Sequence, residues 1–288
     1  MNFKKIKYSV LSLYFLLTSI CLLVSPLSAS SDPEILKMVF VPASEKGDAS
    51  DYESLISIIS KQAKVQIEPI KVVDYNAAVE AMRANRAHIA WFGGKTYIIA
   101  ADIANAEAFA AGVRKGDSNA GYYAYFVVPA DSPIKELKDI KGKTLSLNSI
   151  GSTSGDLIPR VEIKKAGLNV NDFKNIVYAG SHDACMLAAI NKQADVCGVS
   201  SRNFDARIAD GTIKSSDIRI IHRSPLVPPP PLAYSTKLSK ELRDRIKRAT
   251  LEAHKFGKIG GYGGEMSHYI EVVDTDYDSL RAIDRLLN

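Results

Sequence analysis

The sequence predicts an α/β protein of two lobes, each built around a mainly parallel sheet. Short apolar runs typical of strands alternate along the chain with segments whose apolar residues recur at helical spacing. A chain of 288 residues is long enough for two lobes of ordinary size. The pattern breaks at Pro129 and Pro133, which predicts a crossover between lobes, and four prolines at 228–231 predict the stiff return connection.

The N-terminus has the features of a secretory signal peptide. Three lysines within the first seven residues precede an uncharged run over 8–24, and small residues follow. We therefore expect residues 1–30 to be removed by cleavage after Ala29 or Ser30 and the protein to be exported. A membrane anchor is the alternative, but the apolar run is shorter than the usual span of about 20 residues. A lipoprotein is disfavoured because no small residue precedes Cys21.

The charge of the mature chain argues against nucleic acid as a partner. Cleavage removes three lysines and no acid, so the formal net charge falls from +5 to +2. The basic residues over 61–64 and 243–248 occur at helical spacing with apolar residues between them, which is typical of solvated helix faces. Nucleic-acid binding requires a concentrated basic surface, which this pattern does not provide.

The first lobe is expected to comprise residues 31–128 and 232–288. Apolar residues at 55, 56, 58, 59 and 63 form one face of a helix over 52–64, and Asp74 is suited to cap a helix over 74–84. Strands are expected over 36–41, 65–70, 89–92 and 122–128, and further helices over 240–256 and 277–287.

The second lobe is expected to comprise residues 129–231. Its strands are predicted over 144–147, 176–178 and 195–199, and its helices over 156–166 and 183–192. This alternation of strands and helices is that of βαβ units, in which ligands bind beyond the carboxyl ends of the strands.

Residues 151–155, Gly-Ser-Thr-Ser-Gly, which we call the hydroxyl loop, are the strongest candidate for a binding site. They lie between a predicted strand and a predicted helix, where the first helical N–H groups have no intrahelical partner. Two glycines relax the backbone, and three consecutive hydroxyls can donate to an oxyanion. Such sequences are more often simple helix N-caps, so neighbouring residues must decide between the two interpretations.

Two further segments lie just beyond or at the ends of predicted strands. Trp91 and Phe92 precede two glycines, and the alternative to a binding role is that both rings belong to the core. His182 begins a predicted helix, where it can donate to an oxyanion, as a cation at low pH. We expect residues 91–97 to lie opposite 152–154 and 182.

No catalytic or metal site is predicted. His182 and Asp183 are adjacent, so their side chains diverge and they do not form a catalytic pair with a serine. The chain has no Gly-x-Ser-x-Gly motif. Cys185 and Cys197 have no further ligand at metal spacing, so we expect buried thiols or, in an exported protein, a disulfide if the geometry allows. No cofactor is expected.

Six short signatures together resemble the periplasmic phosphate, phosphite and phosphonate-binding proteins of ABC transporters. The resemblance covers nearly all of the mature chain. It implies a two-lobed type II periplasmic binding fold that closes on a tetrahedral phosphorus oxyanion. The signatures are Asp51–Glu53, Asp74–Val79, Ile89–Gly93, Ser152–Gly155, Ala179–Ala184 and Ser224–Pro228.

The resemblance also implies a set of ligand contacts. The hydroxyl loop would hold the oxygens, His182 and Tyr52 would add donors, and aromatic rings would wall the pocket. Several family members have a tyrosine where this chain has Phe92, so one hydroxyl donor is missing here. The candidate ligand-binding residues are Tyr52, Trp91, Phe92, Tyr97, Ser152, Thr153, Ser154, His182, Ser200 and Arg202.

Specificity follows from what two stretches lack. Family members that bind aminoalkylphosphonates hold the amine with carboxylates in the stretches that match 200–203 and 228–231. Here these are Ser-Ser-Arg-Asn and four prolines, so a buried ammonium would be unpaired. Arg202 would repel it further if it faces the cleft, although an arginine at such a place usually points to solvent.

The expected function is capture of a small oxyanion without an amine for an ABC importer, with its membrane permease as partner. Phosphite is expected first, methylphosphonate second, and phosphate or arsenate after them. One alternative is a sensory protein that presents phosphate or arsenate to a histidine kinase. A less favoured alternative is a periplasmic hydrolase of phosphorus esters, which would turn its ligand over.

Overall fold

The computed structural model describes residues 32–43 and 48–287, and residues 33–288 form one compact unit. The signal peptide predicted over 1–30 lies outside the described residues. Within the described ranges, no helix combines the length and apolar character needed to span a membrane.

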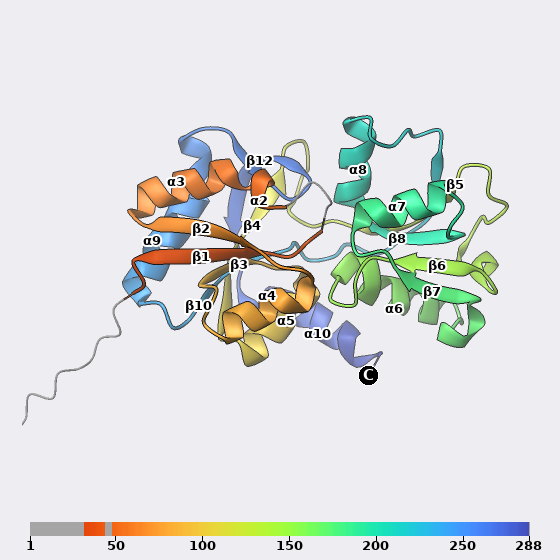
Figure 1. The fold of residues 1–288 in the computed structure, drawn as a ribbon, viewed down its shortest axis with the longest axis horizontal. Helices are drawn as coiled ribbons and strands as arrows, with labels where there is room; N and C mark the ends of the chain where they lie inside the picture. Colours follow the sequence, from red (N-terminus) through yellow and green to blue (C-terminus); the bar gives the residue numbers. More distant parts are fainter. Residues whose placement is uncertain (1–31, 44–47, 288) are drawn as a thin grey trace, which may run out of the picture. The chain divides into compact units, whose positions relative to one another are not determined.

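Two sheets organise this unit (Figure 1). The seven-stranded sheet has the strand order β11 (Ile259–Gly261), β12 (Gly264–Glu271), β4 (Ala106–Arg114), β10 (Leu232–Ser235), β3 (Ile89–Trp91), β1 (Ile35–Phe40), β2 (Gln66–Lys71). The five-stranded sheet has the order β7 (Asn175–Tyr178), β6 (Thr144–Leu147), β8 (Val196–Ser200), β5 (Ala124–Pro129), β9 (Ile218–Arg223).

Helices connect and cover these strands. The α-helices are α2 (Asp48–Asp51), α3 (Glu53–Ala63), α4 (Tyr75–Arg83), α5 (Gly94–Ile103), α6 (Ile158–Lys165), α7 (His182–Ile190), α8 (Ser201–Ala209), α9 (Lys240–Leu251) and α10 (Asp278–Arg285). Short 3₁₀ turns lie at η1 (Leu137–Ile140), η3 (Val170–Asp172), η4 (Ala253–Lys255) and η5 (Asp274–Tyr277), and a π-helical turn, η2 (Thr153–Leu157), precedes α6.

Only the three strands at one end of each sheet are parallel, so the prediction of mainly parallel sheets is corrected to mixed ones. β1 pairs in parallel with β2 on one side and β3 on the other, and β6 pairs in parallel with β7 and β8. The remaining pairs are antiparallel, because β5, β9, β10, β11 and β12 do not follow the βαβ pattern.

The strand order reverses direction at β1 and again at β6. Right-handed crossovers that run in opposite directions put their helices on opposite faces of a sheet. Accordingly α3 and α4 lie on opposite faces of the first sheet, and α7 and α6 on opposite faces of the second (Figure 1). The loops that follow β1 and β6 therefore leave their sheets at a topological switch point, where α/β proteins bind ligands.

Two hydrogen-bonded segments carry the chain between the sheets, one between β4 and β5 and one between β9 and β10. Tyr122 and Val227 exchange backbone hydrogen bonds of 3.2 and 2.8 Å. The four prolines at 228–231 lie in the second segment, as expected for the return connection.

The strand predicted over 122–128 was expected in the first lobe, but it belongs to the five-stranded sheet of the second. β5 pairs with β8 and β9, so the first passage between the sheets precedes residue 124 instead of following residue 128. The apolar run identifies a strand but not its partners, which lie 70 to 98 residues further along the chain.

Amphipathic helices at the C-terminus pack where the sequence places them. α9 packs against α3 and β4, and α10 packs against α5, all of them elements of the first sheet or its covering layer. The buried face of α9 includes Leu242, Ile246 and Ala249, which join the large core cluster of that sheet.

A disulfide joins Cys185 on α7 to Cys197 on β8, with Cα atoms 5.8 Å apart. The sequence left thiols and a disulfide open, and spacing alone could not decide between them. The bond fixes the first half of α7 to the strand that leads into α8.

Loss of this disulfide should destabilise the protein substantially. Closing a loop of about a dozen residues removes chain entropy worth about 3 kcal/mol, so Cys185→Ala/Cys197→Ala should lower Tm by roughly 6 to 12 °C. Calorimetry with and without dithiothreitol measures the effect, and the double variant, insensitive to the reductant, is the control. Two freely reactive thiols in the native wild type would contradict the pairing.

Candidate functional site

Four helix N-termini meet beyond the carboxyl ends of the parallel strands. The first turn of α5 reaches the hydroxyl loop, because the Lys95 N–H donates to Thr153 Oγ1 at 2.9 Å. The N-termini of α7 and α8 also meet. The Ser200 N–H, just before α8, donates to Nδ1 of His182, the first residue of α7, at 3.3 Å. Each N-terminus carries roughly half a positive charge, so their meeting point favours an anion.

Ser152 is a helix cap, which is the simpler of the two interpretations of the hydroxyl loop. Its Oγ accepts from the Gly155 N–H at 3.0 Å and from the Asn148 side-chain amide at 3.5 Å. These bonds occupy the oxygen's acceptor sites, so its hydroxyl hydrogen remains to be donated.

Thr153 and Ser154 are nearly inaccessible, with 1% and 2% of their surfaces exposed. The Thr153 oxygen already accepts from Lys95, which leaves its hydroxyl as a donor. Their backbone N–H groups precede the first hydrogen bond of the π-helical turn, which Leu157 N–H makes to Ser152 O at 3.1 Å. Two hydroxyls and two amides thus form a compact set of donors.

The glycines of this loop are required by packing. Neither Gly151 nor Gly155 has a positive φ, so conformational freedom, which the sequence suggested, is not their role. A Cβ at Gly155 would lie 2.4 Å from the Cβ of Asn148 and 3.0 Å from Cε1 of His182. A Cβ at Gly151 would lie 2.5 Å from the Cβ of Tyr75. The loop can therefore approach both neighbours closely only without side chains at these positions.

An ion pair holds the hydroxyl loop against α5. Lys95 Nζ lies 2.8 Å from Asp156 Oδ2 and 2.5 Å from Ile150 O. Asp156 also accepts from Arg160 Nε at 2.7 Å and from Tyr178 OH at 2.9 Å. The carboxylate beside the loop is thus fully compensated and does not repel an anion.

His182 lies beside the hydroxyl loop but is not a cation at neutral pH. Burial lowers its pKa to about 3. Because Nδ1 accepts from the Ser200 N–H, the neutral ring carries its proton on Nε2 and can donate one hydrogen bond. Burial therefore works against the cationic donor expected at low pH, because no carboxylate among the described residues offsets the desolvation of the ring.

Burial of neutral His182 should make stability depend on pH. The unfolded chain, with an ordinary histidine pKa near 6.5, binds this proton when the folded protein does not, so the free energy of unfolding falls as the pH drops below about 6.5. Between pH 7 and 5 we expect a loss of about 2 kcal/mol from this group. Urea unfolding of wild type and His182→Gln at both pH values tests it, with His254→Gln as the exposed control. Equal pH slopes for wild type and His182→Gln would contradict this origin.

A series of ring contacts forms an aromatic wall. Tyr52 lies 5.7 Å from Trp91, Trp91 lies 4.8 Å from Tyr262, and Tyr262 lies 6.3 Å from Tyr122. The wall ends at the hydroxyl loop: burial raises the pKa of Tyr122, and hydrogen bonds with the hydroxyls of Ser154 and Thr153 partly oppose this.

Sequence reasoning missed Tyr122 and Tyr262. The sequence pattern places Tyr122 in the strand predicted over 122–128, whereas it lies in the passage between the sheets, before β5 begins. Tyr262 lies between glycines in the turn from β11 to β12, and its OH bonds to Asn203 Oδ1. The Gly-Tyr-Gly-Gly sequence was the one available signal, because an aromatic residue in a glycine turn is often placed for contact.

Two predicted site residues lie apart from this wall. Phe92 is fully buried, and its N–H donates to Pro231 O at 3.0 Å. The Tyr97 hydroxyl donates to Asp274 Oδ1 at 2.7 Å and accepts from the Ala108 N–H at 3.2 Å. Its ring packs on Tyr277, so the structure gives Tyr97 a place in the core between α5 and η5.

Ser200 and Arg202 complete the predicted set at the start of α8. Ser200 Oγ accepts from the Arg202 N–H at 3.2 Å. Arg202 is 2% exposed, so the view that it points to solvent is wrong. Its Nη2 donates to Gly112 O at 3.2 Å and to Ala120 O at 2.6 Å, and its guanidinium lies about 6 Å from the rings of Tyr122 and Tyr262.

The described part of the chain contains no group of three or more histidine, cysteine or acidic side chains placed to hold a metal ion. The site consists of neutral donors, helix N-termini and aromatic rings, which together suit a small anion.

Comparison with known proteins identifies the family. The family model for the periplasmic substrate-binding proteins of ABC phosphonate transporters matches residues 38–277. The chain belongs to this family. The expected family is thus confirmed, and its members are periplasmic binding proteins.

Two characterised relatives cover most of the chain. The phosphonates-binding periplasmic protein of Escherichia coli (strain K12) is 30% identical over 234 residues, which are 79% of this chain and 69% of the relative. The phosphate-import protein PhnD of Mycolicibacterium smegmatis is 26% identical over 278 residues, which are 89% and 87% of the two chains.

Solved structures agree on the fold. A binding protein of an ABC phosphonate transporter from Pseudomonas aeruginosa has a TM-score of 0.78 at 24% identity, over 89% of this chain and 87% of that one. PhnD1 of Prochlorococcus marinus, in complex with methylphosphonate, has a TM-score of 0.78 at 21% identity, over 89% and 99%. The predicted type II periplasmic binding fold is confirmed.

Proposed function

We propose that this chain is the exported solute-binding protein of an ABC importer and captures a small phosphorus oxyanion that has no amine. Phosphite is the first candidate and methylphosphonate the second. The observation that carries the proposal is the buried donor set of Thr153 and Ser154, whose hydroxyls and N–H groups meet the N-terminus of α5. A tetrahedral anion can accept several such bonds at once, and bonds to charged acceptors are the strongest.

The neutral donors around the loop support an anionic ligand. Ser152, Ser200 and the Nε2–H of His182 can each donate, because their acceptor atoms are already engaged. Lys95 forms an ion pair with Asp156, so its charge is already compensated. The charge of the ligand would be stabilised mainly by the oriented dipoles of the hydroxyls, N–H groups and helix N-termini.

The aromatic wall supports phosphite and methylphosphonate over phosphate. A P–H or P–CH₃ group needs an apolar neighbour where phosphate has a fourth oxygen that requires a hydrogen-bond partner. Tyr52, Trp91 and Tyr262 form a buried run of rings that would supply this neighbour.

The names of the relatives support the ligand class. They are called phosphonates-binding in Escherichia coli, phosphate-import in Mycolicibacterium smegmatis and probable phosphite-binding in Prochlorococcus marinus, the last 29% identical over 225 residues. All three ligands have the same tetrahedral phosphorus head, and they differ in the group that an aromatic wall would contact.

A hydrolase is disfavoured by the state of the candidate base. With a pKa of about 3 and its Nδ1 engaged by Ser200, His182 is a poor proton acceptor near neutral pH. The disulfide suits export to an oxidising compartment, where delivery to a membrane permease would take place.

Isothermal titration of the mature protein tests the proposal. Phosphite, methylphosphonate, phosphate, arsenate and sulfate should all be compared at one pH and ionic strength. We expect one site per chain and the order phosphite, methylphosphonate, then phosphate or arsenate. Tight binding of sulfate with no binding of the phosphorus anions would overturn the ligand class, and phosphate binding more tightly than phosphite would overturn the ranking.

A further inference from the structure

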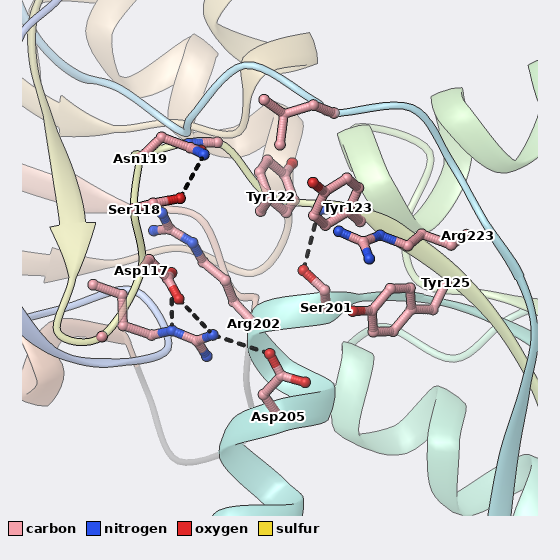
Figure 2. A pocket seen from close by; sticks show the side chains of 14 residues that line it. Asp117, Ser118, Asn119, Tyr122, Tyr123, Tyr125, Ser201, Arg202, Asp205 and Arg223 are labelled. Carbon is pink, nitrogen blue, oxygen red and sulfur yellow. Dashed lines mark hydrogen bonds and ion pairs between the residues drawn. The ribbon is translucent and has the colours of Figure 1, made fainter.

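A cavity lies beside the passage between the sheets, and Tyr122 is one of the residues that line it (Figure 2). Its volume is about 320 Å³, within the size range of small-ligand sites. It is lined by the turn after β4, the start of β5, the start of α8 and the end of β9, and its walls are mostly polar.

The charges in this cavity do not balance. It is lined by three arginines and two aspartates. Arg114 forms ion pairs with both aspartates, with Nε 3.1 Å from Asp117 Oδ2 and Nη2 3.0 Å from Asp205 Oδ2. Arg202 and Arg223 form no ion pair with any described residue.

Arg202 is buried and forms no salt bridge with the described residues, although Asp117 attracts it from a greater distance. Its Nη2 donates to two carbonyls, but its Nε has no hydrogen-bond partner within the described part of the chain. A buried guanidinium that lacks both a carboxylate and one of its hydrogen bonds is costly, and an anion in the cavity would offset that cost.

Arg223 is prepared for a planar anion. Its guanidinium stacks on the Tyr123 ring, with Cζ 3.4 Å from the ring centroid, and Figure 2 shows it directed along the cavity wall toward Ser201. Stacking occupies the face of the guanidinium and leaves its N–H edges free for the two oxygens of a carboxylate. Ser201 Oγ accepts from the Tyr123 N–H at 3.1 Å, so its hydroxyl is available as a further donor.

We propose that this cavity is a second anion site, which binds a carboxylate between Arg223 and Arg202. The carboxylate can belong to a free small acid or to the substituent of a phosphonate held in the hydroxyl loop. The second source rests on the proposed function, and the first does not. Tyr122 adjoins both sites, since it lines the cavity and its hydroxyl bonds to the loop.

The free-acid source is tested by titrating malonate into the mature protein, alone and saturated with methylphosphonate. The proposal predicts one-site binding that Arg223→Gln weakens about tenfold or more, as expected for loss of a bidentate charged contact. Arg223→Lys keeps the charge without the planar fork, so its malonate affinity should lie between those of wild type and Arg223→Gln. Arg219→Gln is the matched control on the same strand, because Arg219 binds the carbonyls of Ser132 and Ile134 outside the cavity.

The tethered source is tested with phosphonoacetate. If the ligand supplies the carboxylate, phosphonoacetate binds more tightly than methylphosphonate, and Arg223→Gln removes the gain while the methylphosphonate Kd stays within about twofold. The proposal is overturned if phosphonoacetate has no such gain and malonate either fails to bind or binds equally to wild type and Arg223→Gln. Failure of all phosphorus anions to bind would refute the proposed function instead, and the malonate titration would still decide about the cavity.

Discussion

Removing both hydroxyls of the loop, in Thr153→Val/Ser154→Ala, should weaken binding of phosphite and methylphosphonate by roughly 10² to 10⁴-fold. Each hydrogen bond to a charged acceptor contributes about 1.5–3 kcal/mol, and each 1.4 kcal/mol is tenfold in affinity. Thr153→Ala alone should cost roughly ten- to a hundredfold. Titration calorimetry of folded variants measures these losses.

Thr250→Val is the matched control for this pair. Thr250 is fully buried, and its hydroxyl donates to Ile246 O at 2.9 Å within α9. The substitution removes a comparable buried hydroxyl on a different element, while Ile246 O keeps its helical N–H partner, and should leave affinity unchanged. An unchanged Kd in the folded double variant would remove the hydroxyl loop from the binding site.

Aminoethylphosphonate should bind at least about a hundredfold more weakly than methylphosphonate. Both ligands offer the same head group, but only one must bury an ammonium, and an unpaired buried charge costs roughly 3–5 kcal/mol. Arg202, 2% exposed and 6.0 Å from the Tyr262 ring, adds repulsion at the start of α8. Competition titrations against methylphosphonate measure the ratio, and equal affinities would refute the exclusion of amines.

Replacing Arg202 by Glu would not be a sound way to give the ammonium of aminoethylphosphonate a carboxylate partner. The arginine donates to the carbonyls of Gly112 and Ala120, and a carboxylate there would face two acceptors and lose both bonds. Arg202→Gln keeps a donor and removes the charge. It should narrow the difference between the two ligands without reversing it, provided that the variant remains folded.

The sequence predicted the core of each sheet and the hydroxyl loop because these depend on local pattern. The strand before the loop was found at its observed bounds, 144–147, from its short apolar run. The helix α5 was missed because its residues are apolar on nearly all sides, so it shows no helical period. Strand β5 was found but assigned to the wrong sheet, since choice of partner is a tertiary property.

The remaining candidate site residues could be found only from the three-dimensional arrangement. Tyr122 and Tyr262 meet across about 140 residues of sequence, through the passage between the sheets and a glycine turn. The charge state of His182 depends on burial and on one backbone N–H, neither of which the sequence reveals. Gly155 is explained by the nearness of Asn148 and His182, not by its own conformation.

A crystal structure of the mature protein with methylphosphonate tests the central claim most directly. The proposal predicts phosphonate oxygens about 2.6–3.2 Å from the hydroxyls and N–H groups of Thr153 and Ser154, with the methyl group against the aromatic wall. A phosphonate bound in the cavity of Arg223 instead, with the hydroxyl loop empty, would contradict it.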